Sequence, residues 1–272
     1  MRVKDKVAVV TGVANPNGIG YASAKALVRE GAILALVDAS KHVHERADEL
    51  KTAGYNVISF QLDLTDLEKV KNMAQKVIAK YGKVDILANV AGLSGVFGAS
   101  RRPRTKGFEE IAEKDHDYLI NVNLKTTFNC IKTFLPGMLE RKYGKIVNVS
   151  SVTGPQVCGP SASGYTAGKA GVCGLTKTLA LEVAAYGITV NSILPGWIYT
   201  GGASYGEPGT PRRMAYDKSI PVKRLGRPED CADLVLFLAS DESSYVNGAE
   251  FIIDGANVIQ EMKMEPAYPT EI

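Results

Sequence analysis

The chain has 272 residues, 45% of them apolar, and its 32 basic and 29 acidic side chains leave a formal charge of +3. So small a charge, with no stripe of Lys and Arg interleaved with aromatic residues, argues against a nucleic-acid partner. The four scattered cysteines, the absence of a signal-peptide pattern and the lack of an apolar run of about 18 residues argue against a disulfide framework, a metal site and a membrane partner, and we expect a cytoplasmic protein.

The chain begins with the pattern of a strand, a glycine-rich turn and a helix. Residues 7–10 are a continuous apolar run, which is typical of a strand covered on both faces. The turn contains Gly12, Gly18 and Gly20, and a helical pattern follows over residues 21–30. Glycines alone would indicate only a tight turn. Between a strand and a helix they let backbone N–H groups approach a pyrophosphate, which predicts a dinucleotide site.

A second strand, residues 33–37, ends in Asp38, 18 residues after Gly20. A carboxylate at this place can accept hydrogen bonds from an adenosine ribose, and its charge would repel a 2′-phosphate. No Arg stands in the glycine turn or directly after Asp38 to compensate, although Lys41 is close. The sequence therefore predicts NAD as the cofactor in preference to NADP. The alternative is a solvated loop acid.

Helical patterns and short apolar runs alternate along the rest of the chain. We expect helices over residues 42–53, 67–80, 108–142, 165–186 and 228–240, and strands over 57–60, 84–88, 145–149, 188–194 and 251–254. This alternation predicts an α/β protein, a single doubly wound, Rossmann-like domain over residues 1–272 with seven parallel strands and helices on both faces. In such folds nucleotides bind at the carboxyl ends of the strands, where the strand order reverses.

Three segments lack a regular pattern. Residues 93–107 hold four cations at Arg101, Arg102, Arg104 and Lys106, which form either a solvated surface loop or a collar for a substrate with an anionic tail. Residues 197–222 are rich in Gly, Pro and Tyr, and we interpret them as a mobile substrate segment over the site. The tail over residues 256–272 has little pattern.

The catalytic chemistry is concentrated in residues 145–169. A strand ends there in Ser150 and Ser151, and Tyr165 precedes Lys169 by four residues, which places the two on one helix face. A fixed cation beside a phenol favours the phenolate, which brings the pKa of the phenol toward neutral pH. The hydroxyl group of Ser151 could then hold a substrate oxygen while Tyr165 gives or takes its proton.

Taken together, these motifs resemble the short-chain dehydrogenase/reductase family over about residues 3–256. The resemblance implies that Tyr165 is the general acid/base, that Ser151 orients the substrate oxygen, and that Lys169 lowers the tyrosine pKa and holds the nicotinamide ribose. It implies that Asn123 positions a water in the proton relay. The implied cofactor contacts are Gly12, Asn17, Gly18, Ile19, Gly20, Asp38, Asp63, Leu64, Asn89, Ala91, Gly92, Tyr165, Lys169, Pro195, Gly196, Ile198 and Thr200.

Some of these roles have alternatives. Asp63 could accept a hydrogen bond from an adenine amino group or cap the helix that follows, for which Thr65 and Asp66 are further candidates. The family usually forms tetramers through the 165–186 helix and the final strand, and the small residues on that helix favour a homotetramer.

The sequence departs from the family pattern in three places, one of which is the region 93–110, longer than usual by several residues and expected beside the substrate pocket. The family usually has three residues between the first two glycines of the turn, whereas Gly12 and Gly18 enclose five. Related enoyl reductases also have a longer turn here, but they carry six residues between the tyrosine and the lysine. The three residues between Tyr165 and Lys169 favour carbonyl reduction. Val90 replaces an asparagine that mainly braces the sheet in the family.

The function predicted from the sequence is NAD-dependent hydride transfer between a secondary alcohol and a ketone of small size. One alternative is a 3-oxoacyl-thioester reductase whose basic residues 101–106 bind a carrier protein or the phosphates of coenzyme A. An alternative of another class is a non-catalytic NAD-binding regulatory protein, against which the complete set of Asn123, Ser151, Tyr165 and Lys169 argues.

Overall fold

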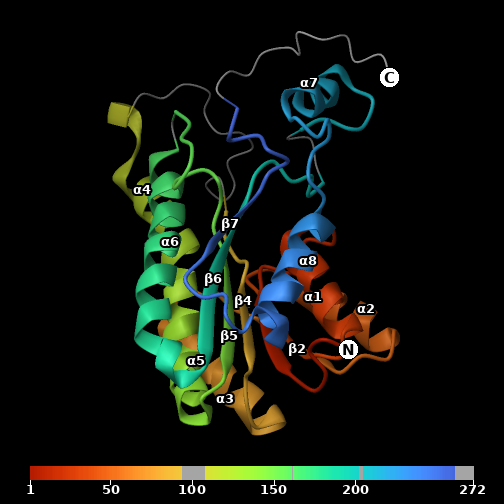
Figure 1. Cartoon of the computed structure of the whole chain (residues 1–272), viewed down its shortest axis with the longest axis vertical. Helices are drawn as coiled ribbons and strands as arrows, with labels where there is room; N and C mark the ends of the chain where they lie inside the picture. Colours follow the sequence, from red (N-terminus) through yellow and green to blue (C-terminus); the bar gives the residue numbers. More distant parts are fainter. Residues whose placement is uncertain (94–107, 161, 202–204, 261–272) are drawn as a thin grey trace.

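In the computed structural model, which describes residues 1–93, 108–160, 162–201 and 205–260, seven parallel strands form one sheet in the order β3-β2-β1-β4-β5-β6-β7 (Figure 1). The strand order reverses between β1 and β4, so the doubly wound sheet expected from the sequence is confirmed. The strands are β1 Val7–Thr11, β2 Ile33–Asp38, β3 Val57–Gln61, β4 Ile86–Asn89, β5 Gly144–Val149, β6 Ile188–Pro195 and β7 Glu250–Ile253.

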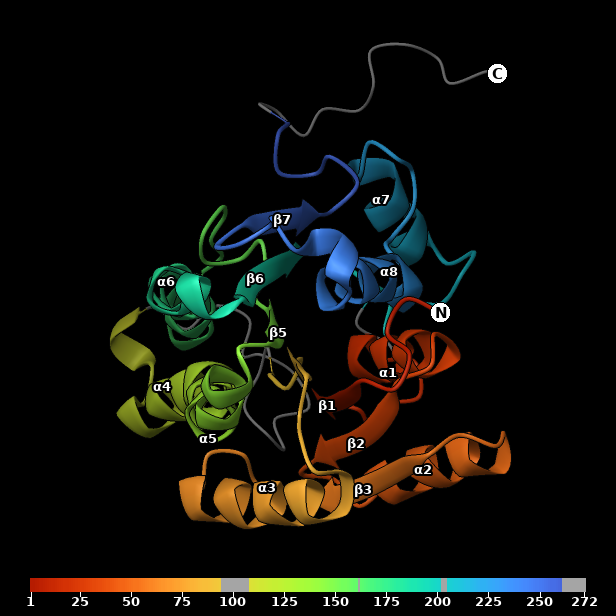
Figure 2. The same ribbon diagram turned by 60° about the horizontal axis from the view of Figure 1, so that its bottom comes forward.

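Helices cover both faces of the sheet (Figure 2). One face carries α1 Ile19–Arg29, α2 Val43–Thr52 and α8 Pro228–Ala239. The other carries α3 Leu67–Tyr81, α4 Glu113–Ile120, α5 Thr126–Arg141 and α6 Ser163–Val183. None of the helices in the described ranges combines the length and the apolarity needed to cross a bilayer.

The two layers of helices create two apolar cores separated by the sheet. Along β1, Ala8 and Val10 belong to the core under α1 and α8, whereas Val7 and Val9 belong to the core under α3 and α5. This division follows from the two-residue period of a strand, and it explains why a central parallel strand is apolar at every position.

The helix α3 shows how the sequence sets the limits of an element. Val70, Ala74 and Val77 recur at helical spacing and are buried against the sheet. The side chain of Asp66 accepts hydrogen bonds from the backbone N–H groups of Glu68 and Lys69, which hold the pKa of its carboxyl group below the usual value. The prediction that Asp66 caps this helix is confirmed, whereas the other two candidates, Thr65 and Asp63, do not cap it.

The region 108–142 is helical as expected but divided. A 3₁₀ turn over Phe108–Glu110 precedes α4, and a π-helical turn over Asn121–Lys125 joins α4 to α5. Apolar periodicity does not distinguish a π turn from an α turn, so nothing in the sequence pattern indicates this division. Such turns are frequent at functional sites.

Several element boundaries differ by one to three residues from the sequence prediction, and two differences have a clear physical reason. The strand β6 does not break before Pro195, because Pro195 still pairs with Ile253 of β7 and its carbonyl accepts from the N–H of Val152. A proline lacks only the donor, so it can be the last residue of a strand. The segment 197–222, expected to be irregular, contains α7 Pro211–Ser219, which Thr210 caps by accepting from the N–H of Arg213. The four cations of residues 101–106, with the roles expected for them, lie outside the described residues, as do residues 261–272 of the tail.

Candidate functional site

The residues singled out in the sequence gather along the carboxyl edge of the sheet. Gly12 follows β1, Asp38 ends β2, and Asn89 ends β4. Ser151 lies two residues beyond β5, and Pro195 ends β6. Because all strands are parallel, these positions share one edge, and the reversal of strand order between β1 and β4 opens that edge to a ligand.

The glycine turn is closely packed against the backbone around it. Gly12 has a φ of +72°, and a Cβ there would lie 2.9 Å from the backbone of Ala91. A Cβ on Gly20 would lie 2.2 Å from the carbonyl oxygen of Gly12. Gly18 is the N-cap of α1 and makes no side-chain cap, so the first N–H groups of this helix are left for an anion. The turn therefore fits the pyrophosphate of a dinucleotide.

Thr11 fixes the distance between the two halves of the fold. Its hydroxyl group accepts hydrogen bonds from the N–H groups of Val90 and Ala91, at 2.9 and 3.0 Å. The end of β1 is thus bound to the turn after β4, at the point where the strand order reverses. This role is not predicted from the sequence, where the polar residue at the end of an apolar strand is the available sign.

Asp38 lies where the sequence placed it, at the end of β2 beside the glycine turn. One carboxylate oxygen accepts from the N–H of Ala14 and the other from the N–H of Ser40, both at 2.9 Å. A carboxylate has about four acceptor sites, so two remain for the hydroxyl groups of a ribose. Asp38 therefore both holds the glycine turn and fits the predicted contact.

Asp63 and Leu64 follow β3 on the same edge. Asp63 is exposed, and one of its carboxylate oxygens accepts from the N–H and the hydroxyl group of Thr65, both at 2.8 Å. Leu64 is buried, and its carbonyl accepts from the side chain of Asn129 on α5. These bonds fix the loop in place, and the adenine contact stays a prediction.

Asn89 belongs to a buried polar chain through the sheet. Its side-chain amide donates to Asn148 on β5, and Asn148 donates in turn to Thr176 on α6. Asn89 thus links the end of β4 through β5 to α6. The side-chain oxygen of Asn89 is buried and accepts no hydrogen bond from any described residue, so it can accept one from a bound group.

Lys169 is a buried cation on α6. Its side chain is 4% exposed, and the ammonium group donates to the carbonyl oxygen of Val149 at 2.8 Å. Burial lowers the pKa of Lys169 to about 8. At pH 7 about nine in ten such groups are still protonated. The site therefore holds a poorly hydrated positive charge, whose field is screened less than that of a surface lysine.

The side chains around Lys169 bring three distant segments together. A Cβ on Gly92 would lie 2.9 Å from the Lys169 ammonium nitrogen and 2.6 Å from the side-chain oxygen of Asn123. Asn123 lies in the π-helical turn, donates to the carbonyls of Leu93 and Leu119, and accepts from the N–H of Leu93. Its buried amide is thus bound by backbone groups, and the predicted partnership with a relay water stays a prediction.

The serine pair and the tyrosine complete this cluster. Ser150 donates to the carbonyl of Lys169 at 2.8 Å, which fixes the backbone of α6 against β5. The hydroxyl oxygen of Ser151 accepts from the N–H of Thr153 at 3.1 Å and retains its own proton to donate. Tyr165 lies in the first turn of α6, with the Lys169 ammonium 6.0 Å from its ring centroid. The arrangement suits proton exchange with an oxygen held by Ser151.

The segment after β6 crosses toward α8. A Cβ on Gly196 would lie 2.5 Å from Cβ of Asp254, so only glycine fits there. Tyr199 donates its N–H to the carbonyl of Gly226, and Ile198 is buried. Thr200, the last predicted contact, accepts a hydrogen bond through its carbonyl from the side chain of Asn15 at 2.9 Å.

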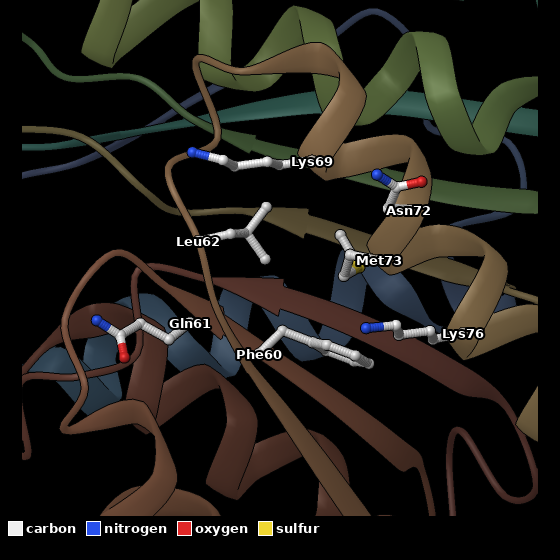
Figure 3. Close-up of a pocket in the computed structure, with 7 residues that line it drawn as sticks. All are labelled: Phe60, Gln61, Leu62, Lys69, Asn72, Met73 and Lys76. Carbon is white, nitrogen blue, oxygen red and sulfur yellow. The ribbon is translucent and has the colours of Figure 1, made fainter.

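A separate hollow of about 220 Å³ lies between β3 and α3 (Figure 3). It shares no lining residue with the predicted site; Phe60, Gln61, Leu62, Lys69, Asn72, Met73 and Lys76 line it. Within the described ranges, no group of three or more His, Cys, Asp and Glu side chains is placed to hold a metal ion.

Comparison with known proteins gives consistent matches. A family model described as enoyl-(acyl carrier protein) reductase matches residues 12–256. The chain is 37% identical to oxidoreductase UcpA of Salmonella typhimurium, covering 96% of this chain and 97% of the relative. It is 40% identical to the 3-oxoacyl-[acyl-carrier-protein] reductase FabG of Thermotoga maritima, covering 95% and 100%. The crystal structure of levodione reductase superposes with a TM-score of 0.84 at 33% identity, covering 95% and 99%.

The burial of Lys169 predicts a pH dependence of stability. Its pKa is about 8 in the folded protein against 10.5 for an ordinary lysine, so between these values the unfolded chain binds more protons and stability rises with pH. Relative to Lys169→Met, the wild type should gain up to about 1.4 kcal/mol of unfolding free energy per pH unit in this window, and nothing below it. Urea unfolding of the cofactor-free proteins across the window measures this, with the exposed Lys76→Met as control. Parallel curves for Lys169→Met and wild type would contradict it.

Proposed function

The chain belongs to the short-chain dehydrogenase/reductase family, and on that premise we propose that it transfers hydride between a secondary alcohol and a ketone, with NAD as the preferred cofactor. The observation that carries this proposal is the buried Lys169 ammonium on the same helix face as Tyr165, 6.0 Å from its ring centroid. A lysine with only a structural role would not have to lie next to a tyrosine. A general acid/base tyrosine needs a fixed cation of this kind.

Each residue of the cluster has a distinct task in this proposal. In alcohol oxidation, Ser151 holds the substrate oxygen and Tyr165 takes its proton as hydride leaves the carbinol carbon; in ketone reduction the proton returns to the oxygen. Lys169 favours the phenolate form of Tyr165 through its charge. When bound, the nicotinamide ring accepts or supplies the hydride. Asn123 keeps Leu93 and Leu119 in place beside Lys169.

The cofactor would be held by the glycine turn, Asp38 and the groups around Lys169. The turn and the first N–H groups of α1 suit the pyrophosphate, and Asp38 suits the adenosine ribose. The buried side-chain oxygen of Asn89 could accept a hydrogen bond from the bound cofactor. The predicted contacts of Asn17, Ile19, Gly196, Ile198 and Thr200 lie on the same edge of the sheet and form part of this proposal.

A second candidate function is reduction of 3-oxoacyl thioesters. It is favoured by the 40% identity to the reductase FabG of Thermotoga maritima over that protein's whole length. The matching family model is described as enoyl reductase, but the three residues between Tyr165 and Lys169 favour carbonyl over enoyl reduction. Because both candidates use the same four catalytic residues, only the substrate distinguishes them.

A cytoplasmic location stays a prediction.

A panel of substrates tests the reaction class together with Tyr165→Phe. Secondary alcohols with NAD, and ketones, acetoacetyl thioesters and crotonyl thioesters with NADH, would be followed by the absorbance of NADH. On any responsive alcohol or ketone, Tyr165→Phe should lower kcat by a factor of about 10² to 10⁴, because the proton loses its carrier. The control Tyr186→Phe, at the end of the same helical region, should behave as wild type.

The results separate the candidates. Turnover of acetoacetyl thioesters alone would support the second function, and turnover of crotonyl thioesters would contradict both. Cofactor binding without turnover of any substrate would indicate a regulatory protein. Wild-type turnover by Tyr165→Phe would refute the mechanism.

Asp38 should set the cofactor preference. Replacing it by asparagine removes the charge that repels a 2′-phosphate while keeping an acceptor for the N–H of Ala14. The ratio of kcat/KM with NAD to that with NADP should therefore fall in Asp38→Asn by a factor on the order of ten. Asp48→Asn, an exposed change on α2, is the matched control. An unchanged ratio would show that Asp38 does not select the cofactor.

A homotetramer is the proposed assembly. Leu181 on α6 is 84% exposed, and Ile252 lies on β7, the edge strand of the sheet. Both side chains lie on α6 and β7, the two elements through which the tetramer is expected to form, where a contact would cover them. Light scattering should give a mass of four times 29.1 kDa, and Leu181→Glu should lower that mass because the charge would be buried in the contact. Ile78→Glu on α3 is the control, and a monomeric wild type would refute the proposal.

A further inference from the structure

The two extra residues of the glycine turn place Asn15 within reach of the segment that follows β6. The side-chain amide of Asn15 donates to the carbonyl of Thr200 at 2.9 Å. These residues are 185 positions apart in the chain. The bond therefore joins two segments that are far apart in the sequence.

Asn15 is an exposed residue whose side chain accepts one hydrogen bond and donates another. Its side-chain oxygen accepts from the N–H of Asn17 at 3.0 Å, and its backbone carbonyl accepts from the N–H of Gly18 at 3.0 Å. These two bonds shape the turn itself. They leave the amide nitrogen for Thr200, so one side chain both builds the turn and reaches out of it.

The neighbouring residue is bound on the opposite side. The N–H of Ala14 donates to Asp38 at the end of β2, next to the residue that donates to Thr200. Two consecutive residues thus connect the end of β2 with the segment after β6. The strands β2 and β6 are four spacings apart in the sheet, about 19 Å. The connection crosses the place where the strand order reverses.

The segment 196–201 is positioned to make this contact. It is bound to residue 226 at two points, because Tyr199 donates to the carbonyl of Gly226, and the N–H of Gly226 donates to the carbonyl of Trp197. At its end, Gly201 has a φ of +84°, and a Cβ there would lie 3.2 Å from the side-chain nitrogen of Asn17. The segment therefore runs close along the glycine turn.

We propose that Asn15 is a positioning residue that couples the glycine turn to the segment 196–201, so that a dinucleotide held by the turn also orders Ile198 and Thr200. The inference rests on the proposed function for the identity of the ligand, but the contact itself exists without it. Binding an anion at the first N–H groups of α1 restrains the turn. Through Asn15, that restraint reaches residues predicted to contact the reactive end of the cofactor.

Hydrogen exchange of backbone amides tests the coupling, with peptides covering residues 12–20 and 196–201. The variant Asn15→Ser keeps an acceptor for the N–H of Asn17 but cannot reach Thr200, and Asn15→Ala removes both bonds. In the cofactor-free protein, Asn15→Ser should exchange faster over 196–201 by a factor of about 2 to 10, with little change over 12–20. Asn72→Ser on α3 is the matched control and should equal wild type.

Addition of NAD supplies the second comparison. In wild type it should slow exchange in both peptides. In Asn15→Ser it should slow exchange over 12–20 as much as in wild type but slow exchange over 196–201 less, because only the direct contacts of the cofactor remain there. A purely structural loosening would instead change the 196–201 peptide equally with and without NAD. Dissociation of NADH, followed by its fluorescence, should be faster in Asn15→Ser by a similar factor.

The outcomes are distinct. Wild-type exchange over 196–201 in Asn15→Ser, without and with NAD, would overturn the inference, and so would NAD-dependent protection of 196–201 in the variant as large as that in wild type. If wild type bound no dinucleotide at all, the proposed function would fail. The cofactor-free comparison would then still decide whether Asn15 fastens the two segments.

Discussion

The ammonium group of Lys169 is a charge held almost entirely out of water, and the chain around it is arranged to make that burial tolerable. Removing an ammonium group from water costs several kcal/mol in a protein unless other groups replace the solvent. The carbonyl of Val149 at the end of β5 does so directly. Ser150 anchors the backbone of Lys169 itself, and the glycine at position 92 leaves the space in which the ammonium lies. One charge therefore constrains β5, the turn after β4 and α6 together.

The parallel sheet makes these constraints compatible. Every strand ends at the same edge, so a residue placed just beyond a strand arrives at the site without further folding. Thr11 and Asn89 then fix the neighbouring strands to each other: Thr11 binds the turn after β4, and Asn89 begins a chain of hydrogen bonds through β5 to α6. The apolar cores on the two faces supply the free energy of folding, while these few buried polar bonds determine how the edge residues are aligned.

Much of this arrangement could be predicted from the sequence, because it depends on local patterns. Apolar runs of the central strands, the helical spacing in α3 and the four-residue step from Tyr165 to Lys169 each follow from a period that the sequence displays. The helix α7 was not predicted, because its mean composition is polar and its start depends on the cap at Thr210. The π-helical turn that holds Asn123 was not predicted either, because its bonds to Leu93 and Leu119 are set by packing rather than by period.

One contact of the glycine turn could not be predicted from the sequence. The length of the turn could be counted in the sequence, and the departure from the family spacing was evident, but the partner of Asn15 could not be found in that way. Thr200 is contacted through a backbone carbonyl, which every residue possesses, so no sequence pattern marks it. The contact arises because the segment after β6 returns across the edge of the sheet toward α8, where Gly226 binds it. The longer turn lies at the reversal of strand order, where both halves of the fold are close. One side chain there, Asn15, can therefore reach a segment that is distant in the sequence.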